Sequence, residues 1–207
     1  GADAALTVPL GESVLRGKVF YGLSNGKIPL ADEQWDISGS PMAGGYLEFQ
    51  HGSWQVRGSY ANIRFERDLP IARVLNISPA VISDALNFLS TEGKRTHYYS
   101  VGIVYDNGPW QGQFMLNHIE QGAKALENSD GGYVLLGYRV GQVTPYLGYS
   151  WIRSHERSRM TTGDPLNNSV ATYVMQDSHS DQKTTIAGLR WDVARNVALK
   201  AQWDGIR

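Results

Sequence analysis

The sequence predicts an all-β fold, an antiparallel up-and-down transmembrane β-barrel. Three observations lead to this prediction. Apolar and polar side chains alternate along one segment after another, the connections between segments are alternately short and long, and the 207 residues include 11 Tyr and 6 Trp. A strand of such a barrel faces lipid on every second residue only, so the chain as a whole reads as polar, with a mean hydropathy of -0.33.

Ten segments show the period of two that is typical of β-strands. In one of them, Trp110–Asn117, the residues Trp, Gly, Phe and Leu alternate with Gln, Gln, Met and Asn. The phase changes after Tyr60, and this predicts a β-bulge near Asn62. The ten predicted strands are Ala4–Leu10, Leu15–Ser24, Pro41–Gln50, Trp54–Ala61, Tyr98–Tyr105, Trp110–Asn117, Tyr133–Val140, Pro145–Trp151, Ile186–Val193 and Val197–Asp204.

The connections between these strands carry a more specific signal. The short ones consist of residues that favour tight turns, and they are Gly11–Ser13, His51–Ser53, Asp106–Pro109, Gly141–Gln142 and Ala194–Asn196. The long ones between them are polar, and they are Asn25–Ser40, Asp68–Thr96, Glu120–Gly131 and Arg153–Gln182. In a barrel of the outer membrane, all turns at one rim are short and all loops at the other are long, so the alternation favours that topology.

The whole chain, residues 1–207, is expected to form a single barrel domain or a part of one. Within it, residues 68–96 are predicted to be a long loop with one short helix, Ser78–Leu89. Ser78 can cap this helix, Pro79 suits its first position, and Val81, Ile82, Ala85, Leu86 and Leu89 form an apolar stripe. The stripe could narrow a pore, contact a neighbouring subunit or cover apolar surface of its own loop.

The composition excludes several classes of function. Lys and Arg number 19 and Asp and Glu 20, for a net charge of -1, so we expect no nucleic-acid partner. The absence of cysteine excludes disulfides, zinc sites built from thiolates and thiol nucleophiles. The sequence also lacks HExxH and facial-triad spacings, and we expect neither a metal site nor a cofactor.

The alternation fits a soluble β-sandwich or lipocalin-like barrel as well, but such a fold keeps its apolar face inside. Here aromatic residues gather at strand ends beside the turns, where a ring can lie half-hydrated at the level of lipid headgroups. The predicted lipid-facing aromatic girdle consists of Trp54, Tyr105, Trp110, Tyr149, Trp191 and Trp203. This placement favours the membrane barrel, and a soluble all-β binding module remains an alternative.

Two stretches, VYDNGPW at 104–110 and GGYVLLGYRVGQVTPYLGYS at 131–150, resemble the strand–turn–strand repeats of bacterial outer-membrane porins, in particular those of gamma-proteobacteria. The resemblance implies a trimeric barrel of about sixteen to eighteen strands in the outer membrane of a Gram-negative bacterium. It also implies a signal peptide and an aromatic last residue, whereas this chain begins at Gly1 and ends at Arg207. We therefore expect a ten-strand portion of such a barrel.

A porin is a passive diffusion channel for small hydrophilic solutes, and its selectivity comes from charges that line the pore. The polar faces of the predicted strands supply these candidates: Arg16, Lys18, Glu48, Arg57, Arg139, Arg190, Asp192, Lys200 and Asp204. Cations outnumber carboxylates among them, and this predicts a mild preference for anions. The alternative is a network of hydrated wall residues that selects by size alone. The expected partners are small hydrophilic solutes, outer-membrane lipid and, as the resemblance implies, further copies of the chain in a homo-oligomer.

Enzymatic interpretations have weaker support, and we expect the chain not to be an enzyme. Ser178, His179 and Asp181 are near neighbours on an extended chain, where their side chains point apart and cannot form a triad. His155 with Glu156, and His118 with Glu120, could supply either a metal site or an acid–base pair. The alternative function is a barrel hydrolase with a rim active site, for which the last long loop offers Asp164, Asp177, His179 and Asp181.

Overall fold

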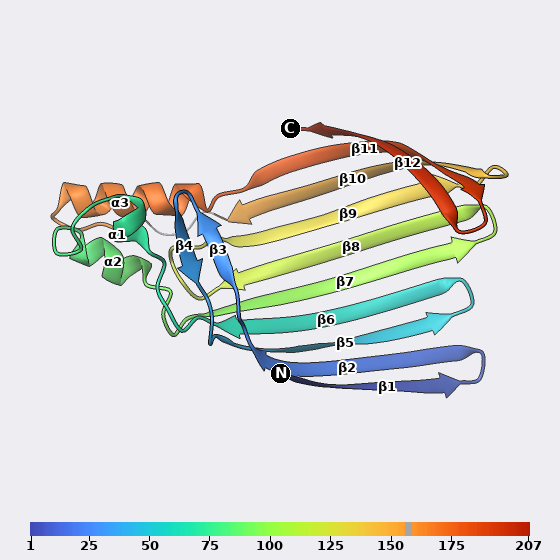
Figure 1. Cartoon of the computed structure of the whole chain (residues 1–207), viewed down its shortest axis with the longest axis horizontal. Coiled ribbons are helices and arrows are strands. Elements are labelled where there is room, and N and C mark those ends of the chain that lie inside the picture. The colour runs from blue at the N-terminus through green and yellow to red at the C-terminus, as the bar shows by residue number, and fades with distance from the viewer. Residues whose placement is uncertain (156–158) are drawn as a thin grey trace.

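The computed structural model describes residues 1–155 and 159–207. A single antiparallel sheet of ten strands dominates the fold, and each strand pairs with the next along the chain except where the small β3–β4 hairpin intervenes between β2 and β5 (Figure 1). The strands of the sheet are β1 (Ala2–Leu10), β2 (Ser13–Leu23), β5 (Pro41–His51), β6 (Trp54–Arg64), β7 (Arg95–Asn107), β8 (Trp110–Gln121), β9 (Asn128–Tyr138), β10 (Val143–His155), β11 (Asp181–Ala194) and β12 (Val197–Ile206).

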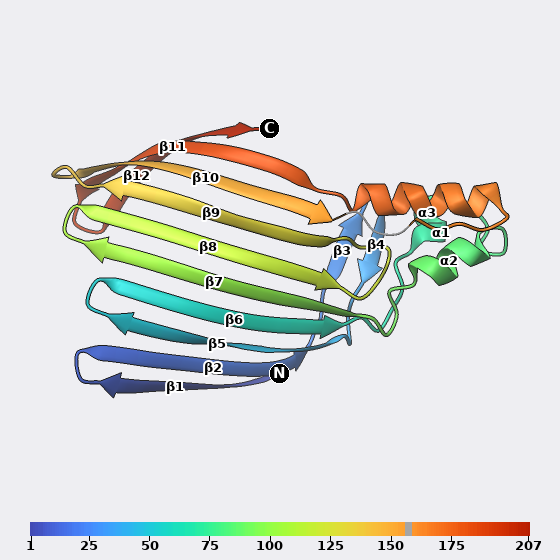
Figure 2. The same ribbon diagram turned by 180° about the vertical axis from the view of Figure 1, so that it is seen from behind.

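All ten predicted strands are present, and most of them are longer than predicted. The sheet is not closed, because β1 and β12 are its two edges (Figures 1 and 2). In a membrane the backbone groups along such edges need partners, since lipid offers no hydrogen bonds. The fold is therefore all-β, and it corresponds to a portion of a barrel wall.

The predicted bulge near Asn62 is wrong. The pairing of β6 with β7 runs without interruption from Trp54 opposite Tyr105 to Arg64 opposite Arg95. The apolar pattern changes there because the strand continues beyond the apolar band, so that polar residues take over the outer positions. The sheet does have an irregularity elsewhere, between Asp192 and Ala194 where β11 pairs with β12.

The tight turns all lie at one end of the sheet and the longer connections at the other, as predicted (Figure 1). Gly11 and Gly141 have φ values of 64° and 60°, which a residue with a Cβ adopts at a cost.

One predicted long connection, Glu120–Gly131, is much shorter in the structure. β8 extends to Gln121 and β9 begins at Asn128, because the strands continue past the apolar band on polar residues.

Three helices lie beyond the loop ends of the strands (Figure 1): α1 (Ile71–Val74), α2 (Ser83–Leu89) and α3 (Pro165–Asp177). They share a core in which Ile82, Ala85, Leu89 and Ala171 are fully buried. The apolar stripe of α2 thus covers apolar surface of the loops themselves, which was one of the three predicted possibilities.

Helix α2 begins at Ser83, five residues later than predicted, and Ser78 does not cap it. In a continuous helix the N–H of Ala85 would donate to the carbonyl of Val81. The side chain of Asn167 in α3 forms hydrogen bonds with both groups instead. Its Oδ1 accepts from Ala85 N at 2.8 Å, and its Nδ2 donates to Val81 O at 3.2 Å. The contact between α2 and α3 therefore sets the start of α2.

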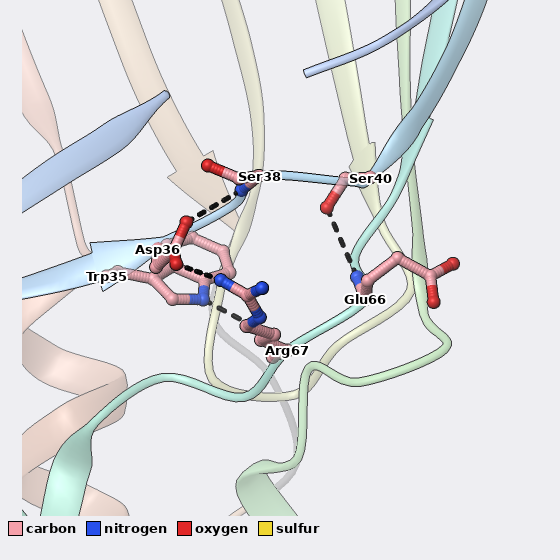
Figure 3. A network of polar contacts seen from close by, with 6 residues as sticks. All are labelled: Trp35, Asp36, Ser38, Ser40, Glu66 and Arg67. Atoms are coloured by element: carbon pink, nitrogen blue, oxygen red, sulfur yellow. Dashed lines mark hydrogen bonds and ion pairs between the residues drawn. The ribbon is translucent and has the colours of Figure 1, made fainter. Parts of the chain in front are cut away.

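The connection between β2 and β5 contains a second, two-stranded sheet of β3 (Lys27–Leu30) and β4 (Glu33–Asp36). The β3–β4 hairpin is fixed at its base to the segment that follows β6 (Figure 3). Trp35 donates from Nε1 to the carbonyl of Arg67 at 3.1 Å, and its ring packs on Phe65 with centroids 4.5 Å apart. Neither this hairpin nor α3 was predicted from the sequence.

Candidate functional site

The two faces of the sheet differ in chemistry and in exposure. Successive residues of a strand point to opposite faces, and the register joins these positions into continuous rows. One face, here called the outer face, is apolar, and its side chains are exposed; Leu47, for example, is 59% exposed. The opposite, inner face carries the charged side chains beside some apolar ones, such as Phe20 and Leu135, and is more enclosed; the neighbouring residue Glu48 is 7% exposed. Apolar side chains thus point outward to the surroundings, which does not support the soluble alternative.

The inner face of β2, β5 and β6 holds a cluster of charges. Glu48 accepts from Arg16 Nη1 and from Gln55 Nε2, both at 2.8 Å. Arg57 lies opposite Glu48 in the register, and its guanidinium stacks over the ring of Tyr46 at 3.6 Å from the centroid. Two cations therefore flank one carboxylate in this cluster.

A second cluster lies on the inner face of β11 and β12. Arg190 forms an ion pair with Asp192 at 2.8 Å, and Lys200 is directly opposite Arg190 in the register. In the part of the chain that the structure describes, Lys200 has no carboxylate within ion-pair distance. Asp204, further along β12, accepts from Gln202 at 2.9 Å. Here too, two cations and one carboxylate lie together on neighbouring strands.

The overall excess of cations predicted for this face is not found. β1 begins at Ala2, which brings Asp3 onto the inner face, where it pairs with Lys18 at 2.9 Å. β7 extends to Asn107, which adds Asp106. Arg139 follows the end of β9 and lies at the turn end of the sheet, outside the strand. Cations and carboxylates of the strands are therefore balanced as a whole, and the cations dominate only within the two clusters.

The six predicted girdle residues all lie on the outer face, at two levels. Near the turns, Trp54 packs on Tyr105 and Trp110 on Tyr138, each with ring centroids 4.6 Å apart, and Trp191 lies at the same end. Nearer the loops, Tyr149 and Trp203 occupy the outer face, together with aromatic residues that the prediction missed, among them Tyr21, Tyr60, Tyr99 and Trp151. An apolar band bounded by aromatic rings is typical of a strand that crosses a bilayer.

Beyond the aromatic residues nearer the loops, the outer face carries a histidine–carboxylate cluster at the loop end of the sheet. Asp130 lies between two imidazoles, 2.6 Å from His118 Nδ1 and 2.7 Å from His155 Nε2. Both histidines are candidates in the sequence, but with other predicted partners. Of these partners, Glu120 lies on β8 opposite His97, and Glu156 lies outside the described residues. Asp130 comes close to both histidines only through the pairing of β8, β9 and β10.

The four rim residues considered for a hydrolase do not form one site. Asp164 caps α3 by accepting from Leu166 N at 2.9 Å, and it also accepts from Asn167. These two hydrogen bonds, the one from Asn167 foremost, lower the pKa of Asp164. His179 binds Glu127, which is 8% exposed, with 2.7 Å between Nδ1 and Oε2. Asp177 ends α3 and Asp181 begins β11.

No helix among residues 1–155 and 159–207 is long and apolar enough to span a bilayer. Within the same residues, no group of three or more His, Asp or Glu side chains is arranged to hold a metal ion.

Comparison with known proteins gives no sequence relative: no family model and no curated protein matches the chain. Its fold does match solved structures. One of them is OmpT of Vibrio cholerae, an outer-membrane protein folded in vitro and solved in a trimer form, with a TM-score of 0.56 and 12% identity. The fold is that of an outer-membrane β-barrel. The alignment covers 99% of this chain and 54% of that protein, so the chain spans about half of its neighbour's length. This fold and the apolar outer face agree with the predicted outer-membrane location.

The likeness to OmpT also corrects one expectation. We expected the chain not to be an enzyme, and this expectation is corrected. The fold that the chain shares with OmpT is compatible with unrelated functions, so it does not exclude an enzyme, and the match itself assigns no activity. The histidine–carboxylate cluster at the rim is a further reason to keep an enzymatic role in view.

Proposed function

We propose that the chain forms part of the wall of an outer-membrane diffusion channel for small hydrophilic solutes. The observation that carries this proposal is the division of the sheet into an apolar outer face and an inner face with hydrogen-bonded charges. Charged side chains on the inside of a barrel favour a water-filled lumen, since a dry interior would leave them without hydration.

The proposed channel has a mild preference for anions. In the two inner-face clusters, Arg16 and Arg57 flank Glu48, and Arg190 and Lys200 flank Asp192. Each cluster carries one more cation than carboxylate, and such local excess raises the concentration of anionic solutes nearby. The other carboxylates of the inner face lie outside these clusters, so the preference is expected to be small.

The proposed assembly is a homotrimer in the outer membrane of a Gram-negative bacterium, with outer-membrane lipid against the apolar band. The resemblance to porin repeats supports this assembly, and OmpT, which shares the fold, was itself solved in a trimer form. In this arrangement part of the outer face contacts lipid and part contacts neighbouring copies.

Conductance in a planar bilayer under a salt gradient tests the proposal. The expected result is a steady ohmic conductance whose reversal potential shows a slight preference for anions. A preference for cations would refute the argument from the two clusters and leave the channel intact. An absence of conductance from protein that has folded and inserted would refute the channel.

A second candidate function is a hydrolase at the rim, and the cluster of Asp130 with His118 and His155 favours it. A carboxylate that orients an imidazole makes the imidazole a better general base, which could activate water at the membrane surface. Asp130→Asn and His118→Gln would then abolish turnover of ester or peptide substrates and leave conductance unchanged. Full turnover in both variants would refute this candidate.

A further inference from the structure

The outer face of the sheet holds a broad groove of about 1220 Å³. The groove crosses the strands from β2 to β10, and most of the residues that line it occupy outer positions. Part of its floor is glycine: a Cβ on Gly58 would have no atom within 4 Å, so the space above this residue is open. The groove is therefore a hollow in the wall that the surrounding side chains leave unfilled.

The lining of the groove changes along its length. Toward β5 its outer positions are mostly small or apolar, among them Ala43, Gly45, Leu47 and Val101. At the opposite end the groove is lined by Trp151, His118 and Asp130. The register places Gly45, His118 and Asp130 in one row across β5 to β9, a distance of roughly 19 Å at about 4.8 Å between strands. One leaflet contributes about 15 Å to the hydrocarbon core of a bilayer, so the groove is long enough for a fatty acyl chain.

The histidine at this end of the groove is oriented for proton transfer. Asp130 Oδ1 lies 2.6 Å from Nδ1 of His118, and the other carboxylate oxygen lies 2.7 Å from Nε2 of His155. When His118 donates from Nδ1 to Asp130, its Nε2 is left as a proton acceptor. Within residues 1–155 and 159–207, no hydrogen bond occupies that Nε2. The His118 side chain is 43% exposed, so water can reach it.

We propose that the substrate of the hydrolase at the rim is a membrane lipid, whose acyl chain lies in this groove and whose ester carbonyl lies at His118. The inference rests on the second candidate function and names its substrate class. The groove lies on the face that is turned to lipid, and its apolar part leads to the imidazole. A peptide in the same place would leave backbone N–H and C=O groups without partners against apolar side chains, which is costly.

The proposed reaction is hydrolysis of the ester by water. Nε2 of His118 takes a proton from a water molecule while the water oxygen bonds to the ester carbonyl carbon. The bond between this carbon and the alcohol oxygen then breaks, and the imidazolium gives the proton to the leaving oxygen. Asp130 stabilises the imidazolium between these two steps. The products are a fatty acid and the remaining alcohol, and His118 returns to its neutral form.

Hydrolysis assays on the folded protein in detergent micelles test the inference. The three probes are dipalmitoylphosphatidylcholine mixed into the micelles, water-soluble p-nitrophenyl acetate, and casein. We expect the unmodified protein to release palmitate and His118→Gln to abolish this release. Gly58→Trp fills the open space of the groove two strands away from His118. We expect it to lower the turnover of the phospholipid relative to that of p-nitrophenyl acetate at least about tenfold, because the acyl chain no longer positions the ester.

The matched control is Ala201→Trp, which places the same ring on the outer face of β12, outside the groove. If Gly58→Trp lowers the ratio of the two turnovers no more than Ala201→Trp, the groove is refuted as the acyl site. Palmitate release that persists in His118→Gln would refute the role of His118. Cleavage of casein or p-nitrophenyl acetate without cleavage of the phospholipid would refute the substrate class and leave the hydrolase intact. No turnover of any probe by the folded protein would instead refute the hydrolase itself.

Discussion

Replacement of Glu48 tests how the inner face is held together. Glu48 is 7% exposed and accepts two hydrogen bonds of 2.8 Å, from Arg16 and Gln55. Removal of one partner of a buried ion pair costs about 3–5 kcal/mol, because the remaining charge has no partner. The Arg16 side chain is 40% exposed, so water screens part of that loss and the lower limit applies. We expect Glu48→Ala to lower the free energy of unfolding by about 3 kcal/mol, roughly a 100-fold change in the folding equilibrium.

Urea unfolding from lipid vesicles, followed by tryptophan fluorescence, measures this free energy. Glu48→Gln keeps the shape and one acceptor but loses the charge, and we expect a smaller loss of about 1–3 kcal/mol. The control is Glu12→Ala in the exposed first turn, for which we expect a change within about 0.5 kcal/mol. If Glu48→Ala were as stable as Glu12→Ala, the inner-face cluster would not stabilise the fold and the reasoning would be wrong.

Three further predictions concern the sheet and the loops. A Cβ on Gly45 would lie 2.4 Å from a backbone oxygen of β2, whereas a Cβ on Gly58 would have no atom within 4 Å. In the same urea assay, Gly45→Ala should therefore lower the free energy of unfolding by about 1–3 kcal/mol and Gly58→Ala should leave it almost unchanged. Equal losses in the two variants would contradict the close approach of β2 and β5. In a vesicle insertion assay, Val101→Arg in the apolar band should make the free energy of insertion less favourable by about 2–4 kcal/mol, while Ser100→Arg on the inner face should change it little. A larger loss for Ser100→Arg than for Val101→Arg would reverse the assignment of the two faces. The pKa of Asp164 is lowered by its hydrogen bonds from Asn167 and Leu166, so its stabilisation of α3 is present above the unfolded-state pKa and is lost as the pH falls through the lower, folded-state pKa. Hydrogen-exchange protection at the start of α3 should therefore fall in acid, and Asp164→Ala should remove this pH dependence; unchanged protection in the variant would show that the cap contributes nothing.

The sequence predicted the sheet well, because each strand carries its own period of two and each tight turn its own residues. It predicted the ends of the strands poorly, since outside the bilayer the outer positions no longer need to be apolar. The bulge expected near Asn62 has this origin, and so does the missed contribution of Asp3 to the inner face. Both errors come from reading the apolar pattern as the full extent of a strand.

The contacts at the loop end depend on pairings between distant residues. Asn167 sets the start of α2 from 82 positions away, and Asp130 meets its histidines only across three paired strands. No local pattern carries this information. Helix α3 is different, because Asp164 followed by Pro165 is a recognisable start of a helix and could have been used. The β3 and β4 strands have four residues each, too few for a clear alternation.

We infer that alternate residues of the sheet face lipid on one side and water on the other. The chain contains no cysteine, so single cysteines can be introduced along β8 without background. In protein reconstituted in vesicles, a charged, membrane-impermeant thiol reagent should label cysteines at Gln113 and Met115 and spare those at Phe114 and Leu116. Labelling of Phe114 and Leu116 with protection of Gln113 and Met115, or equal labelling at all four positions, would contradict the claim.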